Sequence, residues 1–303
     1  MTNQNNQSDV ECARERALLS LIGLSIGDGF GYSMMWEYER VAARQEPTPP
    51  WTWTDDTEMA CSVVATLLAR GRIDADHLAA SFAEHHDPGR MYGPRMLHEY
   101  FPRVFRGEPW SDVAASLFGG SGSFGNGAAM RIAPLGAYFA GDPERAAAEA
   151  EVSARVTHTH PEGVAGAVAV AIAASLFAAH DVADHADFLQ HIAGFLSATE
   201  VRYGLERAAS IPDDTTPEDA AAELGNGSRV SAQDTVPFSI WSASTGRTNF
   251  ASAIWRTVSV GGDMDTTAAM VGGMLAPFLG EPGIPPAWLA AREPLPTWVT
   301  PAR

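Results

Sequence analysis

Two short stretches of the sequence combine carboxylates with threonine hydroxyls just ahead of apolar segments. Their side chains are Thr54, Asp55 and Asp56 in the first stretch and Asp263, Asp265 and Thr266 in the second. Neighbouring carboxylates repel one another unless a positive charge lies between them. Oxygen ligands without cysteine or histidine suit hard cations such as Mg²⁺ or Mn²⁺ rather than zinc. The two stretches therefore predict one metal site.

Helix capping is a simpler explanation for either stretch. Asp and Thr are favoured at helix N-termini, and Asp55 with Glu58 resembles a capping box. Capping requires one acceptor, whereas each stretch supplies three oxygen-bearing side chains. The capping alternative stays open for each stretch alone, and the pair together favours metal binding.

The elements that position these stretches are predicted to be helices. Apolar residues recur at helical spacing from Ala13 to Ile26. Further helical segments are predicted at 57–70, 75–86, 91–106, 111–118, 128–139, 144–179 (two helices), 184–207 (two helices), 232–242, 250–258 and 268–279. Convincing alternating strand patterns are absent from the sequence. We therefore expect an all-α fold, with residues 1–9 as a disordered tail and residues 10–303 as a single domain.

Composition and charge narrow the class of protein. The chain has 303 residues, 46% of them hydrophobic, which is enough for a large core. Its net charge of −17 argues against nucleic acid or an anionic membrane as the main partner. The longest apolar run, residues 163–179, is short for a transmembrane helix and predicts a buried core helix. Two cysteines and a polar N-terminus without an apolar signal segment predict a cytoplasmic location.

Three glycines alternate with other residues at Gly27, Gly29 and Gly31. Their spacing is similar to a dinucleotide-binding loop, but no predicted strand precedes them, so we reject that interpretation. We expect instead that the glycines let the backbone pass close to a ligand or to a neighbouring helix.

At five places, in order along the chain, the sequence resembles the ADP-ribosylglycohydrolases. The matching motifs are Gly27-Asp28, Thr54-Asp-Asp-Thr57, Gly125-Asn-Gly-Ala-Ala-Met-Arg131, Thr157-His-Thr-His-Pro161 and Gly261-Gly-Asp-Met-Asp-Thr266. This family includes the dinitrogenase reductase-activating glycohydrolase and hydrolases of ADP-ribosylarginine and ADP-ribosylserine. The resemblance spans about residues 13–290, and five ordered motifs are far more specific than any one of them.

The resemblance implies an all-α fold that holds two Mg²⁺ or Mn²⁺ ions at the base of a cleft. The resemblance assigns these ions to the six side chains of the two stretches, which are also the side chains selected above by their chemistry. The implied reaction is hydrolysis of an ADP-ribosyl glycosidic bond through an oxocarbenium-like state, which nearby carboxylates such as Asp55 and Asp56 stabilise. Asp28 is expected to orient a metal ligand rather than to bind metal itself.

The residue that handles the proton differs between branches of the family. Members that act on ADP-ribosylserine carry a Glu shortly after the first Gly-Asp, where this chain has Met35. Members that resemble the dinitrogenase reductase enzyme use an Asp in an early loop, which Asp87 matches. We therefore expect Asp87 as the acid/base and arginine-linked ADP-ribose as the substrate. The alternative for Asp87 is a simple cap of the turn at Pro88.

The remaining motif residues are assigned to the substrate. Gly125, Asn126 and Gly127 precede a predicted helix, and the free N–H groups at the N-terminus of that helix are expected to hold the diphosphate. Ser121 and Ser123 are expected nearby. The resemblance places His158 against the ligand. Candidates for stacking on the adenine are Phe124, Tyr92 and Trp241, of which Phe124 and Tyr92 enter the predicted substrate site.

The expected partner is an ADP-ribosylated protein or another ADP-ribose conjugate. Alternatives on the same site are an ADP-ribosylserine hydrolase and an O-acetyl-ADP-ribose hydrolase. A relative that binds ADP-ribose without catalysis is a further alternative, although loss of metal ligands would then be expected, and all six are kept.

Overall fold

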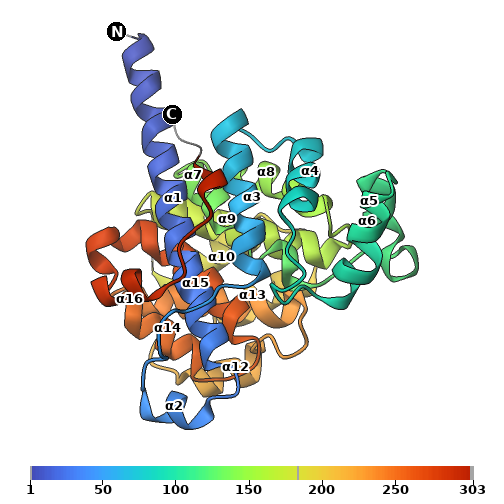
Figure 1. The fold of residues 1–303 in the computed structure, drawn as a ribbon. Coiled ribbons are helices and arrows are strands. Elements are labelled where there is room, and N and C mark those ends of the chain that lie inside the picture. Colours follow the sequence, from blue (N-terminus) through green and yellow to red (C-terminus); the bar gives the residue numbers. More distant parts are fainter. Residues whose placement is uncertain (1, 183, 301–303) are drawn as a thin grey trace.

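In the computed structural model, which describes residues 2–182 and 184–300, helix α1 (Thr2–Met34) packs along α15 (Met264–Leu279) (Figure 1). The two backbones touch, since a Cβ atom added to Gly27 would lie 2.0 Å from the carbonyl oxygen of Ala268. Only glycine permits such an approach. The glycine spacing thus serves contact with a neighbouring helix, one of the two outcomes expected. Because this packing keeps the segment helical, α1 continues past Gly27 to Met34.

The start of α1 also differs from the expectation. The sequence predicts a disordered tail over residues 1–9, whereas α1 begins at Thr2, and Met1 lies outside the described residues. Once the buried part of a helix is formed, each added residue costs little, because the nucleus already exists. The boundary between tail and domain within residues 1–10 stays a prediction.

The first metal stretch lies at the start of α3 (Asp55–Arg70), which packs beside α1. Helix α9 (Pro161–Ala178) is buried from Gly163 to Ala178, as predicted for the longest apolar run. Both Ser8–Met34 of α1 and helix α9 are long and apolar enough to cross a membrane, but most of the apolar stretch in each lies inside the protein. Their packing fits core helices.

Helices make up most of the described chain. The other α-helices are α2 (Tyr38–Ala43), α4 (Ala75–His85), α5 (Phe101–Phe105), α6 (Trp110–Ser116), α7 (Ala133–Tyr138), α8 (Pro143–Arg155), α10 (His185–Gly194), α11 (Glu200–Ala208), α12 (Pro217–Leu224), α13 (Ala232–Gly246), α14 (Phe250–Val258) and α16 (Pro286–Ala291). The short helices are η1 (Met96–Tyr100), η2 (Leu117–Gly120), η3 (Asn126–Ala128), η4 (Glu281–Gly283) and η5 (Thr297–Val299). Residues 2–182 and 184–300 form no strand, only two isolated bridges, so the all-α fold is confirmed.

Several predicted boundaries are wrong. Residues 91–106 form a π-helical turn (η1) followed by α5 rather than one helix, and the helix predicted over 128–139 is reduced to α7. Helices α12 and α16 lie outside all of the predicted helical segments. Both have a proline in their first helical turn, a position where proline starts a helix because its missing N–H is not needed there.

Candidate metal centre and ligand cleft

Three segments far apart in the sequence bring carboxylates together. Asp28 comes from α1, Asp56 from the first turn of α3 and Asp265 from the first turn of α15. Each offers one carboxylate oxygen, and these three oxygens lie within 4.8 Å of one another. All three side chains are buried. We refer to Asp28, Asp56 and Asp265 as the acidic cluster, in which both metal stretches meet.

Burial opposes negative charge in the acidic cluster. Burial, and then repulsion from Asp28, raises the pKa of Asp56 well above its usual value. Burial, and then repulsion from Asp263, raises the pKa of Asp265 in the same way. The pKa of the adjacent Asp55 is also raised, first by burial and then by Asp28. The cluster therefore lacks positive charge, which a divalent cation would supply.

Asp28 holds the first metal stretch in place. Its carboxylate accepts hydrogen bonds from the backbone N–H groups of Thr54 (2.9 Å) and Thr57 (3.1 Å). It also accepts from the hydroxyls of the same two residues, at 2.9 and 2.5 Å. Burial raises the pKa of Asp28 to about 6, although the donors from Thr57 and Thr54 oppose that rise. These contacts place Asp28 directly against Thr54, and its role toward a metal ion stays a prediction.

The donors within the first stretch fit a hard cation. The Thr54 hydroxyl lies 2.9 Å from Asp28 and 3.0 Å from Asp56, but it has one proton and serves one carboxylate at a time. Within the described part of the chain, the buried Oδ1 atom of Asp56 has no hydrogen-bond partner. A buried, unpaired carboxylate oxygen is costly unless a cation or a proton neutralises it. The residues present therefore fit Mg²⁺ or Mn²⁺.

The second stretch is not explained by helix capping. Asp263 occupies the N-cap position of α15, but its side chain makes no capping hydrogen bond in the described structure. Its Oδ2 atom accepts a hydrogen bond from the side-chain amide of Asn126 instead (2.7 Å). In the first stretch, by contrast, the Thr54 hydroxyl does accept from the N–H of Asp56, at a long 3.4 Å. Helix capping thus accounts for the Thr54 hydroxyl but not for the carboxylates of the two stretches.

A cleft of about 580 Å³ opens beside the acidic cluster. Metal-stretch residues that line it are Asp55, Asp56, Asp263, Asp265 and Thr266, whereas Thr54 is buried behind them. Predicted substrate residues that line it are Ser123, Phe124, Gly125, Asn126, Gly127 and His158. The structure therefore joins carboxylates and most predicted substrate contacts in one cavity, which is large enough for a nucleotide-sized ligand.

The loop Gly125–Gly127 in this cleft, called the glycine turn below, is a tight turn rather than the N-terminus of a long helix. Gly125 donates its N–H to the Ser123 hydroxyl (3.2 Å), and only the short helix η3 follows. Asn126 is buried and bonds both Asp263 and Thr235. A Cβ atom on Gly127 would lie 3.0 Å from the His158 ring. The glycines thus let this loop lie between the second metal stretch and His158.

His158 is buried at the cleft wall. Its Nδ1 atom lies 2.7 Å from the Thr157 hydroxyl. Burial, and then the nearby Arg131 guanidinium, lowers the pKa of His158 to about 3. His158 is therefore neutral near physiological pH, so any contact that it made with a ligand would be that of a dipole rather than of a cation.

Residues 9–301 of the chain match the family profile described as ADP-ribosylglycohydrolase. The chain belongs to this family. It is 30% identical over 276 residues to the ADP-ribosylhydrolase ARH3 of Gallus gallus, a match that covers 78% of this chain and 72% of that protein. It is 25% identical over 293 residues to the ADP-ribosyl-[dinitrogen reductase] glycohydrolase of Rhodospirillum rubrum, covering 91% and 90% of the two chains.

A solved structure supports the shared fold. The chain aligns with a protein named "ADP-ribosylglycohydrolase-related protein complex" with a TM-score of 0.65 and 22% identity. The alignment covers 93% of this chain and 94% of that one. The all-helical architecture is therefore that of the ADP-ribosylglycohydrolases over most of the chain.

Asp87 lies outside the cleft of this ADP-ribosylglycohydrolase. Its side chain is 60% exposed, accepts a hydrogen bond from the N–H of Gly89 (2.9 Å) and lies 3.8 Å from Arg90. This is the turn-capping arrangement that was the alternative to catalysis. The structure does not bring the predicted acid/base to the carboxylates, because the loop's own N–H group binds its side chain.

Two other predicted substrate residues also lie elsewhere. Tyr92 is buried and donates its hydroxyl proton to Glu58 (2.7 Å), so it supports the loop beside α3. Ser121 is exposed, donates to the carbonyl of Phe118 (2.7 Å) and lies outside the cleft lining. Trp241, the third aromatic candidate, is fully buried in the core. Among the candidates, only Phe124 presents an aromatic ring to the cleft.

The sequence interpretation missed a second aromatic ring in the cleft. Phe118 is 38% exposed and Phe124 is 40% exposed, and their ring centroids lie 5.9 Å apart. The Arg95 guanidinium lies 5.0 Å from the Phe118 ring. Phe118 has a φ of 54°, a left-handed conformation that is uncommon for a bulky residue. The glycines that follow it were the only signal that this turn was unusual.

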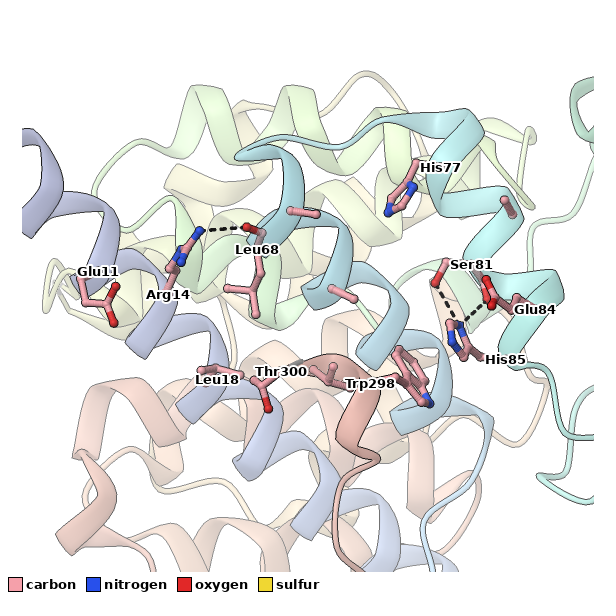
Figure 2. Close-up of a pocket in the computed structure, with 14 residues that line it drawn as sticks. Glu11, Arg14, Leu18, Leu68, His77, Ser81, Glu84, His85, Trp298 and Thr300 are labelled. Atoms are coloured by element: carbon pink, nitrogen blue, oxygen red, sulfur yellow. Dashed lines mark hydrogen bonds between the residues drawn. The ribbon is translucent and has the colours of Figure 1, made fainter. Parts of the chain in front are cut away.

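A second cavity, of about 600 Å³, lies between α1, α3, α4 and the C-terminal turn (Figure 2). Arg14 reaches across it to the carbonyl of Leu68 (3.0 Å), and the His85 ring stacks on Trp298 at 3.7 Å. Its lining includes none of the metal-stretch residues. Of these two cavities, the metal-stretch residues line only the cleft beside the acidic cluster.

Proposed function

We propose that this protein is a metal-dependent hydrolase that cleaves the glycosidic bond between ADP-ribose and an acceptor, with ADP-ribosylated arginine as the preferred substrate. One observation carries the proposal: buried carboxylates from three distant segments converge within 4.8 Å, beside a cleft of about 580 Å³. Membership of the ADP-ribosylglycohydrolase family supports the same reaction.

The metal ligands proposed are the six side chains of the two stretches. They are Thr54, Asp55, Asp56, Asp263, Asp265 and Thr266, with Asp28 behind Thr54. When bound, two Mg²⁺ or Mn²⁺ ions would supply Lewis acidity toward the ribose oxygens and the attacking water. Bound ions would also make the cleft attractive to a diphosphate, which the net charge of −17 would otherwise repel.

The cleft walls divide the substrate into parts. We assign the diphosphate to the turn at Gly125–Gly127 and to His158, which lie together at one wall. We assign the adenine to the exposed rings of Phe118 and Phe124, since offset aromatic contacts suit a flat base. The scissile bond then lies toward the carboxylates.

The carboxylates that line the cleft are the groups available to the reaction. Asp55 and Asp56 face it from the first turn of α3, and we propose that they stabilise the oxocarbenium-like state and that one of them transfers the proton.

The linkage proposed rests on the position of Met35. Met35 lines the cleft, at the place where relatives specific for serine linkages are expected to carry a Glu. An apolar side chain there offers no acid/base, which favours a linkage whose cleavage does not require that Glu. Arginine is therefore proposed ahead of serine and of the acetyl ester.

The test is release of free ADP-ribose from arginine-linked and serine-linked ADP-ribosyl peptides and from O-acetyl-ADP-ribose. Each reaction is run with Mg²⁺, with Mn²⁺ and with a chelator, beside a matched Asp55→Asn variant. Release from the arginine peptide alone, abolished by the chelator, is expected. Release from serine only would keep the fold and site but refute the linkage. Tight ADP-ribose binding without release from any substrate would favour the non-catalytic alternative.

A further inference from the structure

The wall of the cleft contains a short chain of hydrogen bonds that begins at a buried arginine. Arg131 is fully buried, and its Nη2 atom donates to the Thr157 hydroxyl (3.0 Å) and to the carbonyl of Ser153 (3.1 Å). Its Nη1 atom donates to the carbonyl of Gly127 (3.1 Å). A guanidinium is always a donor and has no acceptor atom. The direction of each bond from Arg131 is therefore known without observing hydrogens.

That direction determines the next bond. Because Thr157 Oγ1 accepts from Arg131, its single proton is available for its other partner, His158 Nδ1, at 2.7 Å. The opposite arrangement, with Nδ1–H donating to Thr157, would give the hydroxyl two donors and leave its own proton without a partner in these bonds. A buried, unmatched donor is costly. Donor counting thus makes Nδ1 an acceptor.

We infer that Arg131 and Thr157 are positioning residues that hold His158 as the neutral tautomer with its proton on Nε2, so that His158 donates a hydrogen bond to an anionic oxygen in the cleft. The Nε2 atom lies beside the glycine turn, since Cβ atoms added to Gly125 and Gly127 would lie 3.4 and 3.2 Å from it. A neutral donor binds phosphate oxygen without first taking up a proton.

The low pKa of His158 supports the neutral state but does not select the tautomer. Burial, and then Arg131, lowers that pKa to about 3, so the ring does not become charged between pH 5 and pH 8. Arg131 thus acts twice: its charge opposes an imidazolium, and its hydrogen bond to Thr157 orients the neutral ring. This inference rests on the proposed function, because the anion is taken to be the diphosphate of ADP-ribose.

The experiment records the ring nitrogen resonances of ¹⁵N-histidine-labelled protein with Mg²⁺ present. His158 is assigned by its loss in His158→Gln. Wild-type protein should show a protonated Nε2 and an unprotonated Nδ1 at His158. Thr157→Ser should keep this pattern, whereas Thr157→Val should shift the population toward Nδ1–H. Thr159→Val serves as the matched control, since the Thr159 hydroxyl bonds the carbonyl of Ala114 rather than His158.

Binding of ADP-ribose to the same proteins is measured by calorimetry. Thr157→Val should weaken binding about tenfold, as expected for one lost hydrogen bond to a charged group, and Thr157→Ser should restore it. A protonated Nδ1 in wild-type protein, or an unchanged tautomer in Thr157→Val, would overturn the inference. A protonated Nε2 in wild-type protein that does not bind ADP-ribose would refute the proposed function and the ligand assignment, but not the tautomer.

Discussion

The side-chain amide of Asn126 donates a hydrogen bond to the Asp263 carboxylate at 2.7 Å, which ties the glycine turn to the second metal stretch. The same amide contacts the Thr235 hydroxyl at 3.1 Å. The wall that is proposed to bind diphosphate and the carboxylates that are proposed to bind metal are thus one connected structure. Substrate and metal should therefore influence each other's binding.

Asn126→Ala removes the donor that orients Asp263. We expect Mg²⁺ or Mn²⁺ affinity to fall about tenfold to a hundredfold, the range typical when a partner of a ligating side chain is lost. Isothermal calorimetry of the metal-free protein measures this directly. Thr235→Val removes the amide's other contact and the bond from the Thr235 hydroxyl to the carbonyl of Ser231, but it leaves the bond to Asp263 and should cost less metal affinity. Equal metal affinity in wild type and Asn126→Ala would show that Asp263 does not depend on this bond.

Gly27→Ala tests whether backbone contact between α1 and α15 positions the acidic cluster. The added Cβ would lie 2.0 Å from a carbonyl oxygen that belongs to helix backbone and cannot rotate away. Overpacking of this kind costs about 1–3 kcal/mol or more. Urea unfolding should show that loss in the free energy of unfolding.

The matched control for Gly27→Ala is Gly194→Ala. A Cβ atom on Gly194 meets none of the described residues within 4 Å, so its effect should be small. If Gly27→Ala proved as stable as wild type, the helices would have to separate freely, and the close approach would not be a constraint. A metal titration of both variants measures whether a displacement of α1 from α15 also changes metal affinity at the cluster that contains Asp28.

The metal stretches were predictable from the sequence because their chemistry is local. Asp55 and Asp56 are adjacent in the chain, and no arrangement of the fold can separate them. The contact of Gly27 with a helix was similarly foreseeable, since close approach needs a residue without a side chain. The convergence of α1 with the starts of α3 and α15 needed the structure or the family resemblance.

Side-chain direction in loops was not predictable. Asp87 lies in the expected loop and Tyr92 lies in a segment that was predicted to be helical, and their polar atoms bind Gly89 and Glu58. Such choices depend on partners from other segments, which spacing does not reveal. Phe118 was missed because its exposure depends on a left-handed backbone that its residue type does not suggest.

The acidic cluster should make the metal-free protein less stable as the pH rises. The folded-state pKa of Asp28 is raised to about 6 by burial from an ordinary value of 3.8, so the folded state binds the extra proton. The extra proton on Asp28 contributes about 3 kcal/mol to the free energy of unfolding below about pH 4, and this contribution is lost as the pH rises through 6. Asp56 and Asp265, whose pKa values are also raised by burial, act in the same direction.

Thermal unfolding at pH 5 and pH 7.5 measures this effect. The metal-free protein should melt several degrees lower at pH 7.5, and Mg²⁺ should raise the melting temperature more at pH 7.5 than at pH 5. Asp56→Asn removes one charge and should flatten both dependences. This account of the cluster would be contradicted if the metal-free protein became more stable between pH 5 and pH 7.5, and by the same amount in wild type and in Asp56→Asn.

Asp87→Ala decides between the sequence-based and the structure-based assignment of the acid/base. Because Asp87 is exposed and binds Gly89 of its own turn, we expect the variant to keep its metal affinity and to turn over within about threefold of wild type. Asp56→Asn, by contrast, should lose a hundredfold or more, as expected for a group that acts on the reacting atoms. Single-turnover release of ADP-ribose from the arginine peptide compares the two variants under identical metal saturation. A hundredfold loss in Asp87→Ala with normal metal binding would mean that this loop moves Asp87 into the cleft when substrate binds, and the acid/base assignment would return to it.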